Sequence, residues 1–159
     1  MTNIGAKLIS IEGNIGSGKS TLLRFLKKRI AGVEVIPEPV QEWQSTNLLH
    51  LYYQQPERWA FTFQTYALFS RLKLLRDSYN AAGRKCSLMV SERSIDADHE
   101  VFAKLLHSKG YLNETEYILY KAEFEGFRDV LQLKKVDQFV YLRCSPELCL
   151  KRLSQRNRA

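Results

Sequence analysis

The sequence predicts an α/β fold of three layers, in which a central parallel β-sheet is flanked by helices. Two observations predict it: short apolar runs alternate with long helical patterns, and several helix starts carry capping signals. Strand–helix alternation of this kind is typical of a parallel sheet covered on both faces. Strands are expected at residues 7–12, 33–36, 87–91 and 138–143, and helices at residues 19–30, 56–82, 96–108, 113–134 and 146–154.

Capping signals mark the starts of three of these helices. Pro56 stands in a first turn, where its missing N–H costs no intrahelical hydrogen bond. Asn113 precedes Glu116 by three residues, which is the spacing of a reciprocal cap. Ser145 is a capping residue followed directly by Pro146. Because ligands bind at the carboxyl ends of the strands in such sheets, the residues that follow each strand are candidates for chemistry.

Composition sets broad limits on size and partners. A chain of 159 residues with 45% apolar residues suits one domain with a packed core. The formal net charge of +7 indicates an anionic partner: a nucleic acid, an acidic membrane or a phosphorylated small molecule. Charge alone does not choose among the three.

The cysteines and the apolar runs bear on the compartment. Cys86, Cys144 and Cys149 form no CxxC pair and are not clustered with histidines, as expected for reduced thiols in a cytosol-like compartment. No apolar run approaches membrane-spanning length. The first expected strand begins at residue 7, which leaves no room for a signal or transit peptide. We therefore expect a cytoplasmic protein without a membrane partner.

The first expected strand leads into the sequence GNIGSGKS, which fits the phosphate-loop pattern GxxxxGK[ST]. Glycines let backbone N–H groups curl around an anion, and the following helix adds its partial positive charge. Lys19 is expected to reach the β- and γ-phosphates, and Ser20 to bind Mg²⁺. A chance match in a glycine-containing turn is the alternative, but the flanking strand and helix favour binding of a nucleoside triphosphate. The residues expected to bind it are Gly13, Asn14, Ile15, Gly16, Ser17, Gly18, Lys19, Ser20 and Thr21.

The second strand ends in Pro37-Glu38-Pro39, where two prolines bracket one glutamate. The prolines restrict the backbone and hold Glu38 at the carboxyl end of the strand. A carboxylate at that place can accept a proton from an attacking hydroxyl. A solvated glutamate in a turn is the alternative interpretation.

The third strand ends in Glu92-Arg93 beside the same crevice. Arg93 would keep Glu38 ionised and would cradle phosphate oxygens. Glu92 would help to hold the Mg²⁺ shell. An ion pair with a purely structural role at the surface is the alternative for these two residues.

Within the expected helix at residues 56–82, positions 59–69 hold eight apolar residues among eleven. A helical stretch that is apolar on nearly all sides is expected to be buried. Gln64, Ala67 and Arg71 fall on one stripe of it. An amide suits the edge of a nucleobase because it both donates and accepts. On the helix after the third strand, Asp98 lies four residues before Phe102, so Asp98 is placed to pair with Arg71 and Phe102 to stack on a flat ring. An ordinary core with one buried ion pair is the alternative.

The last 17 residues carry five basic side chains and one acidic one. The basic residues are Arg143, Lys151, Arg152, Arg156 and Arg158. This stretch is either a phosphate clamp or a solvated basic helix end.

Taken together, these stretches resemble the deoxynucleoside kinase family from residue 8 to the last residue. The similarity lies in IEGNIGSGKST, PEPVQEW, PERWAFTFQTYALFSR, SERSIDAD followed by VFA, LNETEYILY and YLRCSPELCLKRLSQRNR. The resemblance implies a three-layer P-loop kinase fold. It also implies that residues 1–159 are a single kinase domain, without most of the lid and without the last strand and helix of the family.

The resemblance also assigns roles to individual residues. Glu38 matches the general base for the sugar 5′-hydroxyl, Arg93 the arginine that pairs with that base and with the phosphates, and Glu92 its acidic neighbour. Gln64 matches the glutamine that contacts the nucleobase, and Tyr53 the tyrosine near the 3′-hydroxyl. The walls of the base pocket match Trp43, Phe63 and Phe102, and the lid arginines match Arg152, Arg156 and Arg158.

Specificity is implied by Ala67, Arg71 and Asp98, which match the set found in members that act on deoxycytidine and purine deoxynucleosides. The implied reaction transfers the γ-phosphoryl of ATP, with Mg²⁺, to the 5′-hydroxyl of a deoxynucleoside, deoxycytidine first. The implied partner is a second copy of the chain, and no nucleic acid is expected. Two alternatives stay open: a nucleoside monophosphate kinase, and a nucleotide- or nucleic-acid-binding module without catalysis.

Overall fold

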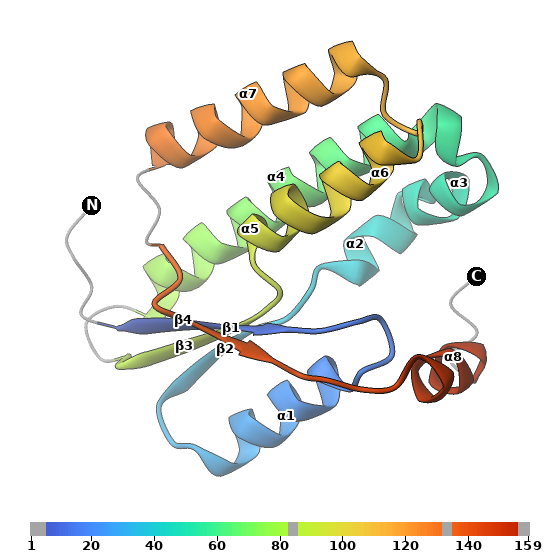
Figure 1. Ribbon diagram of the computed structural model, residues 1–159. Helices are drawn as coiled ribbons and strands as arrows, with labels where there is room; N and C mark the ends of the chain where they lie inside the picture. Colours follow the sequence, from blue (N-terminus) through green and yellow to red (C-terminus); the bar gives the residue numbers. More distant parts are fainter. Residues whose placement is uncertain (1–5, 83–85, 132–134, 156–159) are drawn as a thin grey trace. The chain divides into compact units, whose positions relative to one another are not determined.

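The computed structural model describes residues 6–82, 86–131 and 135–155, drawn as ribbon in Figure 1. The chain divides into two compact units. The sheet unit comprises residues 1–38, 77–94 and 134–159, and the helical unit comprises residues 39–76 and 95–133. Each unit is described separately below.

The sheet unit contains four parallel strands in the order β2-β3-β1-β4 (Figure 1). The strands are β1 (Lys7–Glu12), β2 (Val33–Ile36), β3 (Leu88–Glu92) and β4 (Gln138–Tyr141). Ile9 of β1 pairs with Val90 of β3 on one side and with Gln138 of β4 on the other. All four carboxyl ends therefore meet at one edge of the sheet. The predicted α/β fold, with a parallel sheet flanked by helices, is confirmed.

Two helices of the sheet unit follow strands β1 and β4. Helix α1 (Lys19–Arg29) buries Leu23 against Ile11 and Val90 of the sheet. Helix α8 (Pro146–Ser154) is capped by Ser145, whose hydroxyl accepts a hydrogen bond from the N–H of Leu148, as the sequence predicted.

The helical unit contains two short helices that the sequence did not predict, α2 (Val40–Ser45) and α3 (Leu48–Gln54). Neither has a side-chain cap, and helices of this length are marginal on their own. They form because Trp43 and Leu49 are buried against Ala67 of α4 (Pro56–Ala82). Residues 56–76 of α4 belong to this unit.

The expected helix at residues 96–108 is three consecutive elements in the structure: α5 (Ile95–Ala97), the π-helix η2 (Asp98–Ala103) and α6 (Lys104–Ser108). A π-helical turn closes its hydrogen bonds over five residues instead of four, which periodicity in the sequence does not reveal. Pi-helical turns are frequent at functional sites. Here the turn begins at Asp98, one of the predicted substrate-binding residues.

Helix α7 (Glu114–Leu131) begins with the predicted reciprocal cap, in which Asn113 and Glu116 exchange two hydrogen bonds of 2.9 Å. Its Tyr120 and Phe124 form a core with Leu68 and Leu72 of α4 and with Ala103 of η2. None of the described helices is both long and apolar enough to cross a lipid bilayer.

Candidate active site

The loop of residues 13–20 connects β1 to α1 in the sheet unit, and Gly16 and Gly18 adopt positive φ angles of 80° and 106°. Lys19 is only 6% exposed, and its Nζ donates hydrogen bonds of 3.1 Å to the carbonyl oxygens of Gly13 and Asn14. Burial lowers the pKa of Lys19, and the neighbouring Arg93 lowers it further, while nearby glutamates oppose the shift. The ammonium group is thus held against the main chain of the loop.

Gly16 lies directly against the main chain of α8. A Cβ atom at this position would lie 2.6 Å from the carbonyl oxygen of Cys149. Contacts that short do not occur between unstrained atoms, and the positive φ is also unfavourable for other residues. Glycine at this position therefore lets the loop and α8 pack together.

We expect Gly16→Ala to weaken ATP binding by about tenfold or more, because strain of roughly 1–3 kcal/mol would be relieved by movement of the loop. Calorimetric titration with MgATP measures the change. Gly32→Ala is the matched control, since Gly32 also has a positive φ, of 75°, but its Cβ would meet nothing within 4 Å. Equal ATP affinity in wild type and Gly16→Ala would contradict the role given to this contact.

Arg152 of α8 reaches the same loop. Its Nη1 lies 3.3 Å from the carbonyl oxygens of Gly16 and Ser17 and 3.7 Å from the Sγ of Cys144. The structure thus brings one of the three predicted lid arginines to the loop. The other two, Arg156 and Arg158, lie outside the described residues.

Ser20 and Glu92 meet beside the loop. The hydroxyl of Ser20 donates a hydrogen bond of 2.7 Å to Oε1 of Glu92, which is 7% exposed. Both residues line a cavity of about 510 Å³ in the sheet unit. Hydroxyl and carboxylate oxygens are the ligands that Mg²⁺ prefers, so this pair fits a magnesium ion carried by a nucleotide. No three His, Cys, Asp or Glu side chains of the described residues cluster into a metal site of their own.

Arg93 joins the second and third strand ends to the loop. Its Nη2 donates to the carbonyl oxygen of Gly13 at 3.2 Å, and its Nε lies 3.5 Å from Oε1 of Glu38. Its backbone has a φ of 69°, rare for a residue other than glycine, and its N–H bonds to the carbonyl oxygen of Ile11. A single guanidinium group, that of Arg93, thereby contacts both the Glu38 carboxylate and the phosphate loop.

Glu12 lies next to Arg93 and was not predicted from the sequence as a site residue. Its Oε1 accepts hydrogen bonds from the N–H of Ser94 at 2.8 Å and from the hydroxyl of Ser10 at 2.7 Å. Its Oε2 lies 3.9 Å from Nη1 of Arg93. The sequence pattern marks Glu12 only as the last residue of the first strand. The signal that could have identified Glu12 is its position at the carboxyl end of a parallel strand, where ligands bind.

The predicted substrate-binding residues other than Glu38 and Arg93 lie in the helical unit. Arg71 and Asp98 form the ion pair that their spacing suggested, with 2.6 Å between Nε and Oδ2 and side chains 8% and 4% exposed. The guanidinium of Arg71 also lies 5.1 Å from the ring centre of Trp43. The ion pair is thus enclosed and supported on one side by an indole ring.

Gln64 is 3% exposed on α4. Its Nε2 donates to the main-chain oxygen of Asp98 at 3.2 Å and to the hydroxyl of Tyr120 at 3.3 Å. Tyr120 was not predicted as a site residue, because nothing in the pattern of α7 distinguishes it from an ordinary core residue. The buried amide thus has definite partners on η2 and α7.

Aromatic rings lie next to this polar group. Phe63 makes an edge contact with Trp43, with ring centres 5.4 Å apart, and stacks on Tyr52 at 4.7 Å. Ala67 is buried in the same cluster. Tyr53 of α3 is about half exposed at 52%, and Phe102 is half-buried on η2.

Comparison with known proteins identifies the family. A model of the family described as "Deoxynucleoside kinase" matches residues 9–159. The chain belongs to the deoxynucleoside kinase family. The resemblance predicted from the sequence is therefore confirmed.

Similar members of the deoxynucleoside kinase family come from a virus and from vertebrates. "Probable deoxycytidine kinase FPV151" of Fowlpox virus (strain NVSL) is 39% identical, over 96% of this chain and 62% of that protein. "Deoxycytidine kinase" of Homo sapiens is 38% identical, over 96% of this chain and 66% of that protein. "Deoxyguanosine kinase, mitochondrial" of Xenopus laevis is 34% identical, over 96% and 64%. The chain thus spans just under two thirds of the length of these relatives.

Proposed function

We propose that the protein is an ATP-dependent deoxynucleoside kinase of nucleotide salvage, which transfers the γ-phosphoryl of ATP to the 5′-hydroxyl of a deoxynucleoside. The observation that carries the proposal is the link from Glu38 through Arg93 to the phosphate loop in the sheet unit. A carboxylate held there is suited to take the proton of an attacking hydroxyl.

In this mechanism the protein positions the reactants and stabilises charge. Glu38 takes the proton of the 5′-hydroxyl while the 5′-oxygen bonds to the γ-phosphorus. The bond between the γ-phosphorus and the bridging oxygen breaks, and that oxygen leaves with ADP. Lys19, Arg93 and Arg152 neutralise the phosphate oxygens. Ser20 and Glu92 would hold the Mg²⁺ that accompanies ATP and that supplies further positive charge at the phosphates.

The base-binding residues of the proposal are those of the helical unit. Gln64 would contact the base edge, and the Arg71–Asp98 pair would crowd the side on which thymine carries its methyl group. We propose deoxycytidine as the preferred substrate, with deoxyadenosine and deoxyguanosine accepted. The names of the relatives, deoxycytidine kinase and deoxyguanosine kinase, support this choice. We further propose that both units serve one kinase domain, that two copies form a homodimer, and that the protein acts in the cytoplasm.

A substrate panel tests the proposal. The chain, and a longer form of the protein where the gene encodes one, are incubated with MgATP and each of the four deoxynucleosides or their monophosphates. We expect phosphorylation of deoxycytidine first and of thymidine least. Turnover of the monophosphates alone would make the protein a nucleoside monophosphate kinase. Salt-sensitive binding of DNA or RNA without phosphoryl transfer would make it a binding module.

A further inference from the structure

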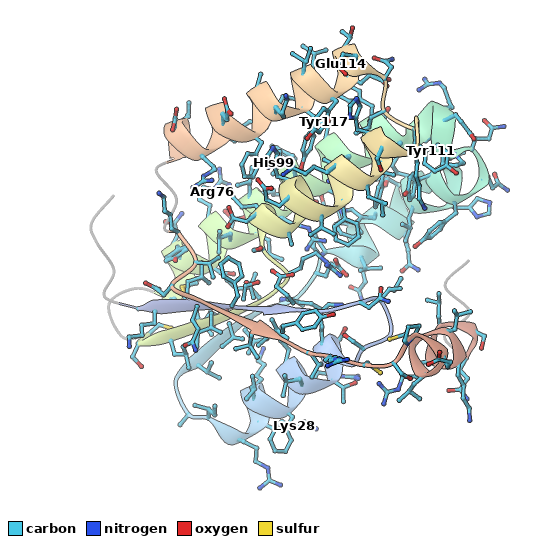
Figure 2. All side chains as sticks on the ribbon, in the orientation of Figure 1. Lys28, Arg76, His99, Tyr111, Glu114 and Tyr117 are labelled. Atoms are coloured by element: carbon cyan, nitrogen blue, oxygen red, sulfur yellow. The ribbon has the colours of Figure 1, made fainter. Side chains whose placement is uncertain are left out.

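Two of the three cysteines lie at the start of helix α8 in the sheet unit. Cys144 comes directly before the capping residue Ser145, in the segment between β4 and α8, and Cys149 is the fourth residue of the helix (Figure 2, sulfur in yellow). An apolar side chain just before a helix cap commonly packs against the fourth helical residue, and a thiol behaves as a small apolar group. This arrangement makes the two thiols neighbours.

The two thiols differ in exposure and in surroundings. Cys144 is half-buried, and its Sγ lies 3.7 Å from Nη1 of Arg152. Reactive cysteines are partly exposed and lie beside cationic groups, and Cys144 meets both conditions. Cys149 is only 3% exposed, and burial together with the neighbouring Cys144 thiol raises the pKa of Cys149. Cys144 is therefore the thiol that an oxidant in the solvent reaches first.

The same side chains contact the phosphate loop. The carbonyl oxygen of Cys149 is the atom that a Cβ at Gly16 would meet at 2.6 Å. Arg152 lies one turn after Cys149, and the Nη1 that contacts Cys144 also lies 3.3 Å from the carbonyl oxygens of Gly16 and Ser17. The Arg152 guanidinium is thus shared between Cys144 and the loop. A displacement of either cysteine therefore changes what the loop packs against.

We propose that Cys144 and Cys149 are an oxidation site, at which a peroxide converts the two thiols into a disulfide and thereby weakens the binding of MgATP to the phosphate loop. This inference rests on the proposed function, because ATP is the nucleotide assigned there to the loop. Disulfides of cytosolic proteins are usually transient and serve catalysis or redox sensing. The reduced pair is accordingly the active form, and the disulfide is the inhibited form.

The oxidation takes two steps and one molecule of hydrogen peroxide. The Cys144 sulfur attacks one peroxide oxygen and the O–O bond breaks, so that Cys144 becomes a sulfenic acid and the released hydroxide leaves as water with the thiol proton. The Cys149 sulfur then attacks the sulfenic sulfur. The S–S bond forms, the S–O bond breaks, and the hydroxide leaves as water with the Cys149 proton. Two sulfurs are oxidised, and one peroxide is reduced to two waters.

The disulfide alters both contacts between α8 and the loop. It draws the Cys144 sulfur toward Cys149 and away from Arg152, which contacts it in the reduced protein. It also constrains the first turn of α8, where the Cys149 carbonyl leaves no room at Gly16 for even a Cβ atom. A shift of about 1 Å in a positioning group costs up to roughly 10²-fold. We expect the oxidised pair to bind MgATP about tenfold more weakly.

The test uses the variant Cys86→Ser, which removes the third thiol. Cys86 donates to the carbonyl oxygen of Leu88 at 3.2 Å, a hydrogen bond that a serine hydroxyl can keep. The variant is treated with hydrogen peroxide, its free thiols are alkylated, and it is digested with trypsin. Cleavage after Arg143 and Lys151 gives one peptide, residues 144–151, that holds both remaining cysteines. We expect this peptide to be lighter by two hydrogens and to carry no alkyl group.

Calorimetric titration with MgATP measures the affinity before and after treatment with peroxide. In Cys86→Ser the affinity should fall by about tenfold and should return when dithiothreitol reduces the disulfide. Two further variants, Cys86→Ser/Cys144→Ala and Cys86→Ser/Cys144→Ser, lack the thiol that reacts first. Each of them should bind MgATP equally well before and after the treatment.

Three results would overturn the proposal. A peptide with oxygen added at Cys144 and with Cys149 alkylated excludes the disulfide. A disulfide without a change in ATP affinity, or an equal loss of affinity in the Cys144 variants, excludes the link to the phosphate loop. A reduced protein that binds no MgATP overturns the proposed function and with it the effect on ATP, whereas the mass of the peptide still decides whether the disulfide forms.

Discussion

Replacing Glu38 with glutamine is expected to lower kcat by about 10²–10⁴ while ATP affinity changes little. The amide keeps the size of the side chain but cannot take the proton of the 5′-hydroxyl. The phosphate loop keeps its own contacts to Lys19 and Arg152, which do not involve Glu38. Rapid-quench measurement of a single turnover with deoxycytidine gives the chemical step, and calorimetric titration gives the ATP affinity.

Glu34→Gln is the control for this change. Glu34 is half-buried on β2, the strand that precedes Glu38, and lies before the carboxyl end beyond which Glu38 meets Arg93. It should turn over at the wild-type rate. A Glu38→Gln variant with normal turnover would remove this carboxylate from the mechanism. A large loss of ATP affinity would instead give Glu38 a role in holding the loop through Arg93.

The candidate residues of the sheet unit were largely predictable because they follow strands whose bounds are clear in the sequence. Strands β1 and β2 have the predicted bounds, and β3 is displaced by one residue. Once three strands are parallel, their carboxyl ends must meet, which brings Glu38, Glu92 and Arg93 to the phosphate loop. Glu12, at the carboxyl end of β1, meets the same condition.

The candidate residues of the helical unit were less predictable because their contacts depend on tertiary packing. Periodicity placed Gln64 and Arg71 on one stripe of a buried helix, and it paired Arg71 with Asp98. It could not show that a π-helical turn begins at Asp98, nor that Tyr120 of a distant helix reaches Gln64. Helices α2 and α3 were missed for the same reason, since they depend on burial of Trp43 and Leu49 instead of on local signals.

Asp98→Asn is expected to lower the free energy of unfolding by about 3–5 kcal/mol, because it leaves the buried guanidinium of Arg71 without its carboxylate. Urea-induced unfolding measures the loss. Asp96→Asn provides the comparison: Asp96 pairs with Arg128 at 3.5 Å, but both side chains are about one third exposed. A pair of that exposure contributes roughly 0–1 kcal/mol.

The double variant Arg71→Gln/Asp98→Asn separates the ion pair from the general effect of altering two buried side chains. Because no charge is left to enclose, the double variant should lose about 2 kcal/mol less free energy of unfolding than the two single variants lose in sum. Strict additivity would mean that the two side chains contribute separately. Coupling would instead show that enclosure, enforced by the Trp43 ring on one side, is what makes this pair costly to break. Since the same enclosed pair is proposed to crowd the thymine methyl group, thymidine should be the substrate whose KM falls most in the double variant.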